Sequence, residues 1–141
     1  MNLSIASILR ALALVAALAL GTHAHAGVVV VAAGSDAAEM DVDAVRRVFL
    51  GRESNLGGSQ AVVVYQRGGA LRERFDTQVL GRSGADLTSY WSRLVFTGRA
   101  RAPEELADDA AVRARVASTP GAIGYIAAGS VDDSVKVVHR F

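Results

Sequence analysis

The sequence predicts an α/β fold: a small mixed or mostly parallel sheet flanked by helices. Two observations carry this prediction. Apolar β-type runs alternate with helical segments along the chain, which is the order expected of α/β proteins. The run Val28–Ala33 (VVVVAA) is continuous and β-branched, a pattern typical of a strand buried on both faces.

The first strand ends at Gly34-Ser35-Asp36, and a helix is expected soon after it. Asp41 can cap a helix over Val42–Leu50, and Gly51 is a plausible stop. Residues 53–60 (ESNLGGSQ) have the composition of a turn or loop. A second buried strand is expected over Ala61–Tyr65.

Two helices are expected in the middle of the chain. The first covers Gly69–Leu80, with Gly81 after it. Ser83, with Asp86 three residues on, resembles a capping box that would open a second helix through Leu94. The following residues 96–103 (FTGRARAP) are predicted to be irregular and basic.

The last part of the chain is expected to hold one helix and two strands. A helix is predicted over Glu104–Ala117, with its acidic residues in the first turn, where the helix dipole favours them. Thr119-Pro120-Gly121 forces a turn. Strands are expected over Ala122–Ala127 and Val135–His139, the latter at an edge because its alternation is weak.

The first 26 residues are predicted to be a secretory signal peptide. An apolar run too short to span a bilayer, Ala11–Leu20, is followed by Ala24-His25-Ala26, which has the small-x-small form of a cleavage site. An uncleaved membrane anchor is the alternative. Cleavage after Ala26 would release one domain, residues 27–141, into the periplasm.

Composition excludes several classes of function. Without Arg10 of the leader, the basic residues equal the 14 acidic ones, which argues against a nucleic-acid binder. There is no cysteine, and after processing the one remaining histidine is His139, expected to be structural. No nucleotide-binding or hydrolase motif is present. We therefore expect no enzyme activity, no metal site and no cofactor.

The segment 62–75 (VVVYQRGGALRERF) is the most informative part of the sequence. A strand, a glycine turn and a helix start together form a generic anion site, because the first helical amides point outward unpaired. Ligands of open α/β sheets collect beyond the carboxyl ends of the strands, so the end of the first strand is the expected opposing wall. The predicted ligand-binding residues are Gly34, Ser35, Arg67, Gly68, Gly69, Ala70, Leu71 and Arg72. An ordinary tight turn at the glycines, and helix or turn capping at Ser35, are the alternatives.

These landmarks resemble the phosphate-binding subunits of ABC transporters, which have the periplasmic binding protein type II fold. The marks include Phe49-Leu50-Gly51, the segment 67–75, Tyr90-Trp91 and residues 96–99 (FTGR). The most specific mark is the sequence TPGAIGY at residues 119–125. The resemblance implies one lobe of such a protein with a reduced second lobe. It departs from the family where Gly69-Ala70-Leu71 replaces the usual Ser-Gly-Thr and so lacks the hydroxyls.

The function that this resemblance implies is non-covalent binding of a small oxyanion, phosphate by analogy, for ABC transport. The implied partners are the anion and an ABC permease or another membrane-associated protein, with a homodimer as a way to replace the second lobe. The alternative is an accessory or interaction protein that keeps the fold without ligand binding.

Overall fold

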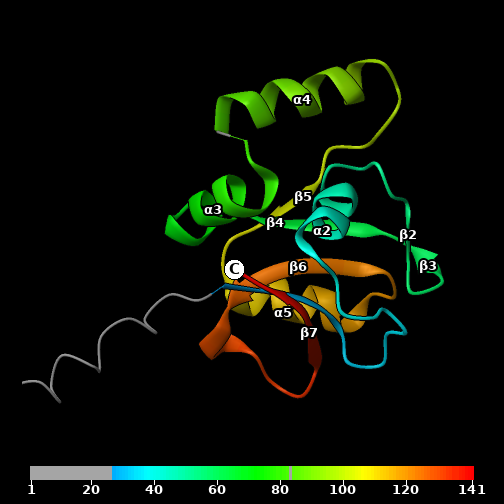
Figure 1. Cartoon of the computed structure of the whole chain (residues 1–141), viewed down its shortest axis with the longest axis vertical. Helices are drawn as coiled ribbons and strands as arrows, with labels where there is room; N and C mark the ends of the chain where they lie inside the picture. Colours follow the sequence, from blue (N-terminus) through cyan, green and yellow to red (C-terminus); the bar gives the residue numbers. More distant parts are fainter. Residues whose placement is uncertain (1–26, 83) are drawn as a thin grey trace, which may run out of the picture.

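The computed structural model describes residues 27–82 and 84–141 (Figure 1). The predicted signal peptide, and Ser83 of the predicted capping box, lie outside the described residues. Within the described part, no helix has the length and apolar character needed to cross a bilayer.

A five-stranded sheet lies at the centre of the domain, in the order β5-β4-β6-β1-β7. Strand β4 runs parallel to both β5 and β6, whereas β1 runs antiparallel to β6 and β7. Four strands therefore point one way and β1 points the other, which confirms the mixed, mostly parallel sheet. The strands are β1 (Gly27–Ala32), β4 (Val62–Gln66), β5 (Glu104–Leu106), β6 (Ala122–Ala127) and β7 (Val135–Arg140).

Two helical layers enclose this sheet (Figure 1). On one face, helix α2 and the α3–η2 segment cover an aromatic core that contains Phe49, Tyr65, Phe75 and Tyr125. On the other face, α5 packs Val112 and Val116 against the alternate residues of β1 and β6. The helices are α2 (Val42–Phe49), α3 (Ala70–Phe75), the π-helical η2 (Asp76–Leu80), α4 (Gly84–Phe96), α5 (Asp109–Ser118) and the short 3₁₀ helix η3 (Ala128–Ser130).

The strand and helix starts follow from local chemistry. The carboxylate of Asp41 accepts a hydrogen bond from the Ala44 amide at 2.7 Å and caps α2, as predicted. The four valines of β1, Val28–Val31, are at most 1 % exposed, which confirms a strand buried on both faces. The predicted loop 53–60 contains a small hairpin, β2 (Asn55–Leu56) with β3 (Ser59–Gln60).

One element was predicted wrongly. Glu104–Leu106 does not begin a helix but forms the edge strand β5, which pairs with Val64–Gln66 of β4. Helix α5 begins later, where the carboxylate of Asp108 accepts from the Ala111 amide at 2.8 Å. The acidic residues at 104 and 105 therefore occupy a sheet edge rather than a helix start.

Gly124 allows α5 to lie close against the sheet. A Cβ atom at this position would lie 2.6 Å from Cγ1 of Val112, which is closer than van der Waals contact. A glycine in the middle of β6 therefore marks a close approach of helix and strand.

Candidate functional site

The predicted strand–turn–helix unit is present at the end of β4. The backbone takes positive φ at Gly68 (70°) and Gly69 (93°), and α3 starts at Ala70. No heavy atom lies within 4 Å of a Cβ built on either glycine, so the turn faces open space. The Glu73 amide donates to the Gly69 carbonyl at 3.1 Å. The amides that precede Glu73 in the first turn of α3 have no carbonyl acceptor within the helix.

This turn forms one wall of a hollow of about 590 Å³, which we call the β4–α5 hollow. The other walls come from the start of α5 and from η3, because β4 and β6 are parallel neighbours that end at the same edge of the sheet. Five of the predicted ligand-binding residues therefore lie together. They are Arg67, Gly68, Gly69, Ala70 and Leu71.

Two side chains of the hollow were not predicted from the sequence: the cationic Arg113 and the hydroxyl of Ser130. Arg113 lies one turn into α5, donates to the Ser130 carbonyl at 2.6 Å and pairs with Asp132 at 3.1 Å. Ser130 lies in η3 and donates its hydroxyl to Asp109 at 2.7 Å. Their proximity to the turn depends on the packing of α5, and no local pattern indicates it.

The hollow also contains a carboxylate, Asp109, which is already well supplied with donors. It accepts hydrogen bonds from Nε2 of Gln66 at 2.5 Å, from the Ala127 amide at 3.2 Å and from Ser130. Gln66 in turn donates to the Tyr125 carbonyl at 3.0 Å. A negative charge therefore sits among donors at the place where an anion would approach.

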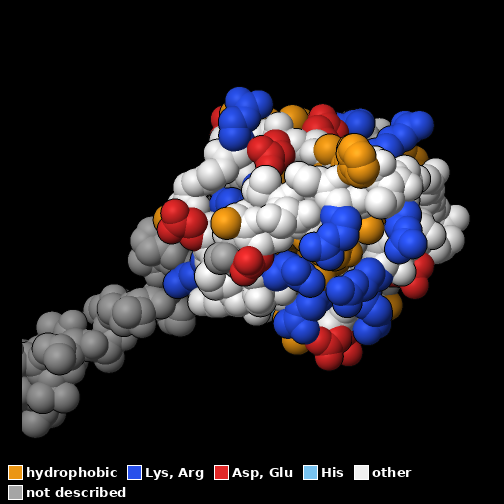
Figure 2. Space-filling model, turned by 90° about the horizontal axis from the view of Figure 1, so that it is seen from above, with side chains coloured by type: hydrophobic (Ala, Val, Ile, Leu, Met, Phe, Trp, Pro, Cys, Tyr) orange, Lys and Arg blue, Asp and Glu red, His pale blue; other side chains and the backbone are white. Residues whose placement is uncertain are grey.

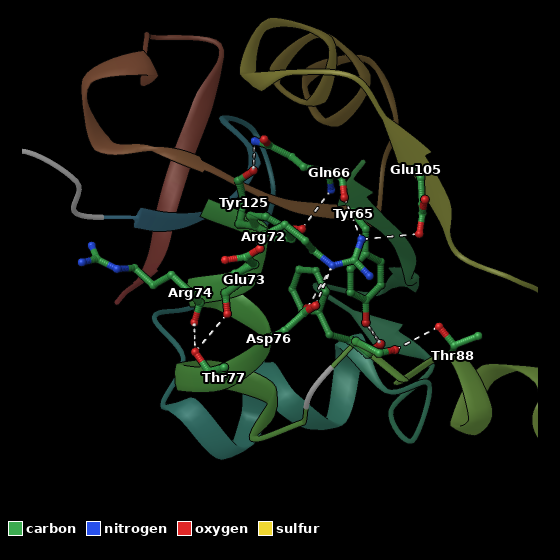
Figure 3. A network of polar contacts seen from close by, with 12 residues as sticks. Tyr65, Gln66, Arg72, Glu73, Arg74, Asp76, Thr77, Thr88, Glu105 and Tyr125 are labelled. Carbon is green, nitrogen blue, oxygen red and sulfur yellow. Dashed lines mark hydrogen bonds and ion pairs between the residues drawn. The ribbon is translucent and has the colours of Figure 1, made fainter. Parts of the chain in front are cut away.

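Arg72 does not face the β4–α5 hollow. Its Nε contacts both carboxylate oxygens of Asp76, at 3.0 and 2.9 Å, and its Nη1 donates to the Gln66 carbonyl at 2.7 Å (Figure 3). The guanidinium also lies 4.7 Å from the ring centroid of Tyr65. Arg72 was predicted to help bind the ligand beside the glycine turn, but these contacts hold it between β4 and η2, outside the hollow.

Burial sets the electrostatics of this network. It raises the pKa of Asp76, and the hydrogen bond from Arg72 offsets this only in part. Burial likewise raises the pKa of Tyr65 and Tyr125, so both hydroxyls stay protonated and act as hydrogen-bonding groups. Tyr125 accepts from the Gln66 amide at 3.0 Å, and Tyr65 donates to the Phe49 carbonyl at 2.7 Å.

Gly34 and Ser35 lie at the opposite end of the sheet. Strand β1 runs antiparallel to β6, so its end lies near Ala122, where β4 begins, and not near Gln66, where β4 ends. The Ser35 hydroxyl accepts from the Ala37 amide at 3.1 Å, and its carbonyl accepts from Lys136 at 2.7 Å. The prediction that this loop opposes the glycine turn is therefore wrong, and Ser35 acts as a turn cap.

The described residues contain no cluster of three or more possible metal ligands. His139 lies on the edge strand β7, where its Nδ1 contacts the Met40 carbonyl at 2.9 Å. What the hollow offers chemically is a set of backbone amides with Arg67, Arg113 and Ser130. Two carboxylates oppose them, Asp109 of α5 and Asp108, which caps this helix.

The fold is shared with proteins of phosphate transport. A phosphate ABC transporter substrate-binding protein of Clostridium perfringens, solved with bound phosphate, superposes with a TM-score of 0.63 at 19 % identity, over 81 % of this chain and 45 % of that protein. An ABC-type phosphate transport receptor of Vibrio cholerae gives 0.65 at 17 % identity, over 82 % and 46 %. PstS of Borrelia burgdorferi gives 0.62 at 10 % identity, over 81 % and 46 %.

The chain thus spans less than half the length of these structural neighbours. They confirm the resemblance in fold that the sequence predicted. No family model and no curated protein matches the sequence.

Proposed function

We propose that this protein is a solute-binding protein that captures a small oxyanion, phosphate by analogy with its structural neighbours, in the β4–α5 hollow. The observation that carries the proposal is the open glycine turn at the end of β4, with free helical amides beside Arg67. Strand ends of this kind collect ligands in open α/β sheets. The neighbours are substrate-binding proteins of transport, which favours binding over catalysis.

The amides of Gly69, Ala70 and Leu71 would hold the anion, and Arg67 would supply charge. Arg67 is exposed, lines the hollow and has no ion pair among the described residues. Backbone amides together with arginine are the usual donors for phosphate and sulfate. Arg113 and Ser130 replace Arg72 and Ser35 in this arrangement.

Calorimetric titration of the purified chain with inorganic phosphate and with sulfate tests the proposal. Arg67→Gln is expected to weaken binding by about 10- to 100-fold, because a charge-assisted hydrogen bond contributes about 1.5–3 kcal/mol. Arg93→Gln, on the exposed surface of α4, is the matched control and should leave binding unchanged. Absence of heat at millimolar concentrations of both anions contradicts anion binding.

A carboxylate placed in the turn gives a second test. Gly69→Asp should abolish binding by repulsion. Gly69→Ala imposes the same strained backbone, with φ at 93°, but adds no charge, and should retain most of the affinity. Equal losses in the two variants would mean that geometry, and not anion binding, explains the effect.

One observation favours the alternative, an interaction protein that keeps the fold without a ligand. Asp109 already accepts three hydrogen bonds within the hollow. Asp109→Asn removes this charge and distinguishes the two functions. In a binding protein the variant should take up phosphate more tightly than the wild type, whereas a ligand-free protein should show no heat in either form.

The same proposal places the protein in the periplasm, released by cleavage after Ala26 and serving an ABC permease. Mass measurement of the secreted chain should give a species that begins at Gly27. Retention of residues 1–26 would contradict the cleavage.

A further inference from the structure

Helix α4, the loop 97–103 and strand β5 form a surface that we call the α4–β5 face. Helix α4 buries only Leu87 among its described residues, although it has 13 residues. At its end, Phe96 is 93 % exposed and Val95 is 44 % exposed. Large apolar side chains gathered in this way mark an interaction surface more often than a single exposed residue does.

A cleft of about 690 Å³, lined mainly by apolar side chains together with Arg72 and Glu105, includes these two side chains in its wall. Leu87 and Trp91 of α4 line one side of it, and Pro103 lines the side next to β5. Seen from above α4, hydrophobic side chains are flanked by a group of lysine or arginine side chains (Figure 2). Phe96 therefore lines the cleft and is almost fully exposed at the same time.

The charges along this face are self-complementary. Arg99 and Arg101 precede Glu104 and Glu105, with Pro103 between them. Within the described part of the chain, neither of these arginines has an ion pair. Glu104 pairs with Arg115 at 2.9 Å, whereas the contact of Glu105 with Arg72 is long, at 3.4 Å. If two copies of the segment run antiparallel across a two-fold axis at Pro103, Arg101 of each copy faces Glu105 of the other.

We propose that a second copy of this chain covers the α4–β5 face in an isologous dimer. Phe96 of each molecule enters the cleft of the other, and Arg101 pairs with Glu105 across the axis. An anionic membrane or a purely acidic partner fits less well, because the two glutamates would repel it. The proposal does not depend on anion binding, since no α4 residue lines the β4–α5 hollow.

The position of strand β5 also favours a second copy of the chain as the partner. It is a three-residue edge strand with one neighbour, β4, so its outer backbone groups are available to another extended segment. Pro103 has no N–H group, and it restricts such pairing to the residues on either side. The contact would therefore be anchored by side chains and supplemented by a few backbone hydrogen bonds.

Sedimentation velocity of the purified full chain over a range of concentrations tests the proposal. Phe96→Ser should weaken dimerisation by about 30-fold or more, as expected for an aromatic anchor at the centre of an interface. Val131→Ser is the matched control, because Val131 is also an exposed hydrophobic residue but lies between η3 and β7. It should leave the dimer intact.

A charge exchange tests the register. Arg101→Glu should weaken the dimer and so should Glu105→Arg, because each variant places like charges opposite each other. An equimolar mixture of the two variants should form heterodimers, because both contacts across the axis then join an arginine and a glutamate. A monomeric wild type at several hundred micromolar overturns the proposal. A dimer that survives Phe96→Ser, or a mixture that stays monomeric, assigns the contact to another surface and also overturns it.

Discussion

The two sides of strand β4 differ sharply in how they are covered. Toward β6, the sheet and its helices enclose an aromatic core in which Phe75 lies parallel to Tyr125, with ring centroids 4.0 Å apart. Toward β5, the sheet ends in an edge strand of only three residues, and Phe96 at the end of α4 is almost fully exposed. Apolar burial stabilises the fold on the first side, while the second side keeps apolar surface available for another molecule.

The largest expected effect comes from replacing one phenylalanine on each side. Phe75→Ala should lower the free energy of unfolding by about 3–5 kcal/mol, because it removes a ring that is fully buried. Phe96→Ala should change the stability of the monomer by less than about 0.5 kcal/mol. Urea unfolding at low protein concentration measures both, and equal effects would remove the distinction between the two sides.

A pair of glycines sharpens the same comparison. Gly124→Ala should destabilise the protein by about 2–3 kcal/mol, since the new methyl group would overlap Val112 of α5. Gly84→Ala, at the start of α4, meets no heavy atom within 4 Å and should be neutral or slightly stabilising. Thermal unfolding of the two variants checks this, and a neutral Gly124→Ala would mean that α5 can move away from the sheet.

Two tyrosine hydroxyls provide a smaller contrast. Tyr125→Phe leaves the buried Gln66 amide without an acceptor and should cost about 1–2 kcal/mol. Tyr90→Phe removes a hydrogen bond from α4 to the Leu50 carbonyl at a half-buried position and should cost less. Denaturant unfolding compares the two, and a larger loss at Tyr90 would show that α4 contributes more to the fold than its burial indicates.

The smallest effect concerns pH. The pKa of Asp76 is raised in the folded state, so the folded protein holds this proton more tightly than the unfolded chain does. The stability that Asp76 contributes is therefore fully present below its ordinary value of 3.8 and is lost as pH rises through the higher folded value.

Asp76→Asn removes this dependence. The free energy of unfolding of the wild type, relative to the variant, should fall as pH is raised from 3.5 toward 6. The comparison cancels the contributions of the other carboxylates. An increase over the same range would mean that the pairing with Arg72 outweighs the burial of the carboxylate.

Local sequence patterns were sufficient to predict most of the helices and strands. The four valines of β1, the Asp41 cap of α2 and the AIGYIA run of β6 each carry their own signal, and the structure has them at nearly the predicted boundaries. The glycine turn at residues 68 and 69 was likewise predictable, because few other residues adopt its positive φ angles.

The errors arose where a neighbour in space decides the outcome. Glu104–Leu106 has no strand pattern and becomes β5 because β4 offers a parallel partner. Asp108 could have indicated the true start of α5, because it is a good capping residue. The predicted helix instead began at Glu104 and placed Asp108 in its interior. Ser35 was misplaced because the direction of β1 in the sheet cannot be read from its residues.

The sequence by itself determined the strands buried on both faces, the helix caps and the open glycine turn, since each depends on side-chain size, a capping group or a backbone angle within a few residues. Tertiary structure alone decided which groups meet. The reversed direction of β1 took Ser35 away from the turn, and the packing of α5 placed Arg113, Ser130 and Asp109 beside it. Strand direction and helix docking depend on contacts between distant segments, and no local pattern encodes them.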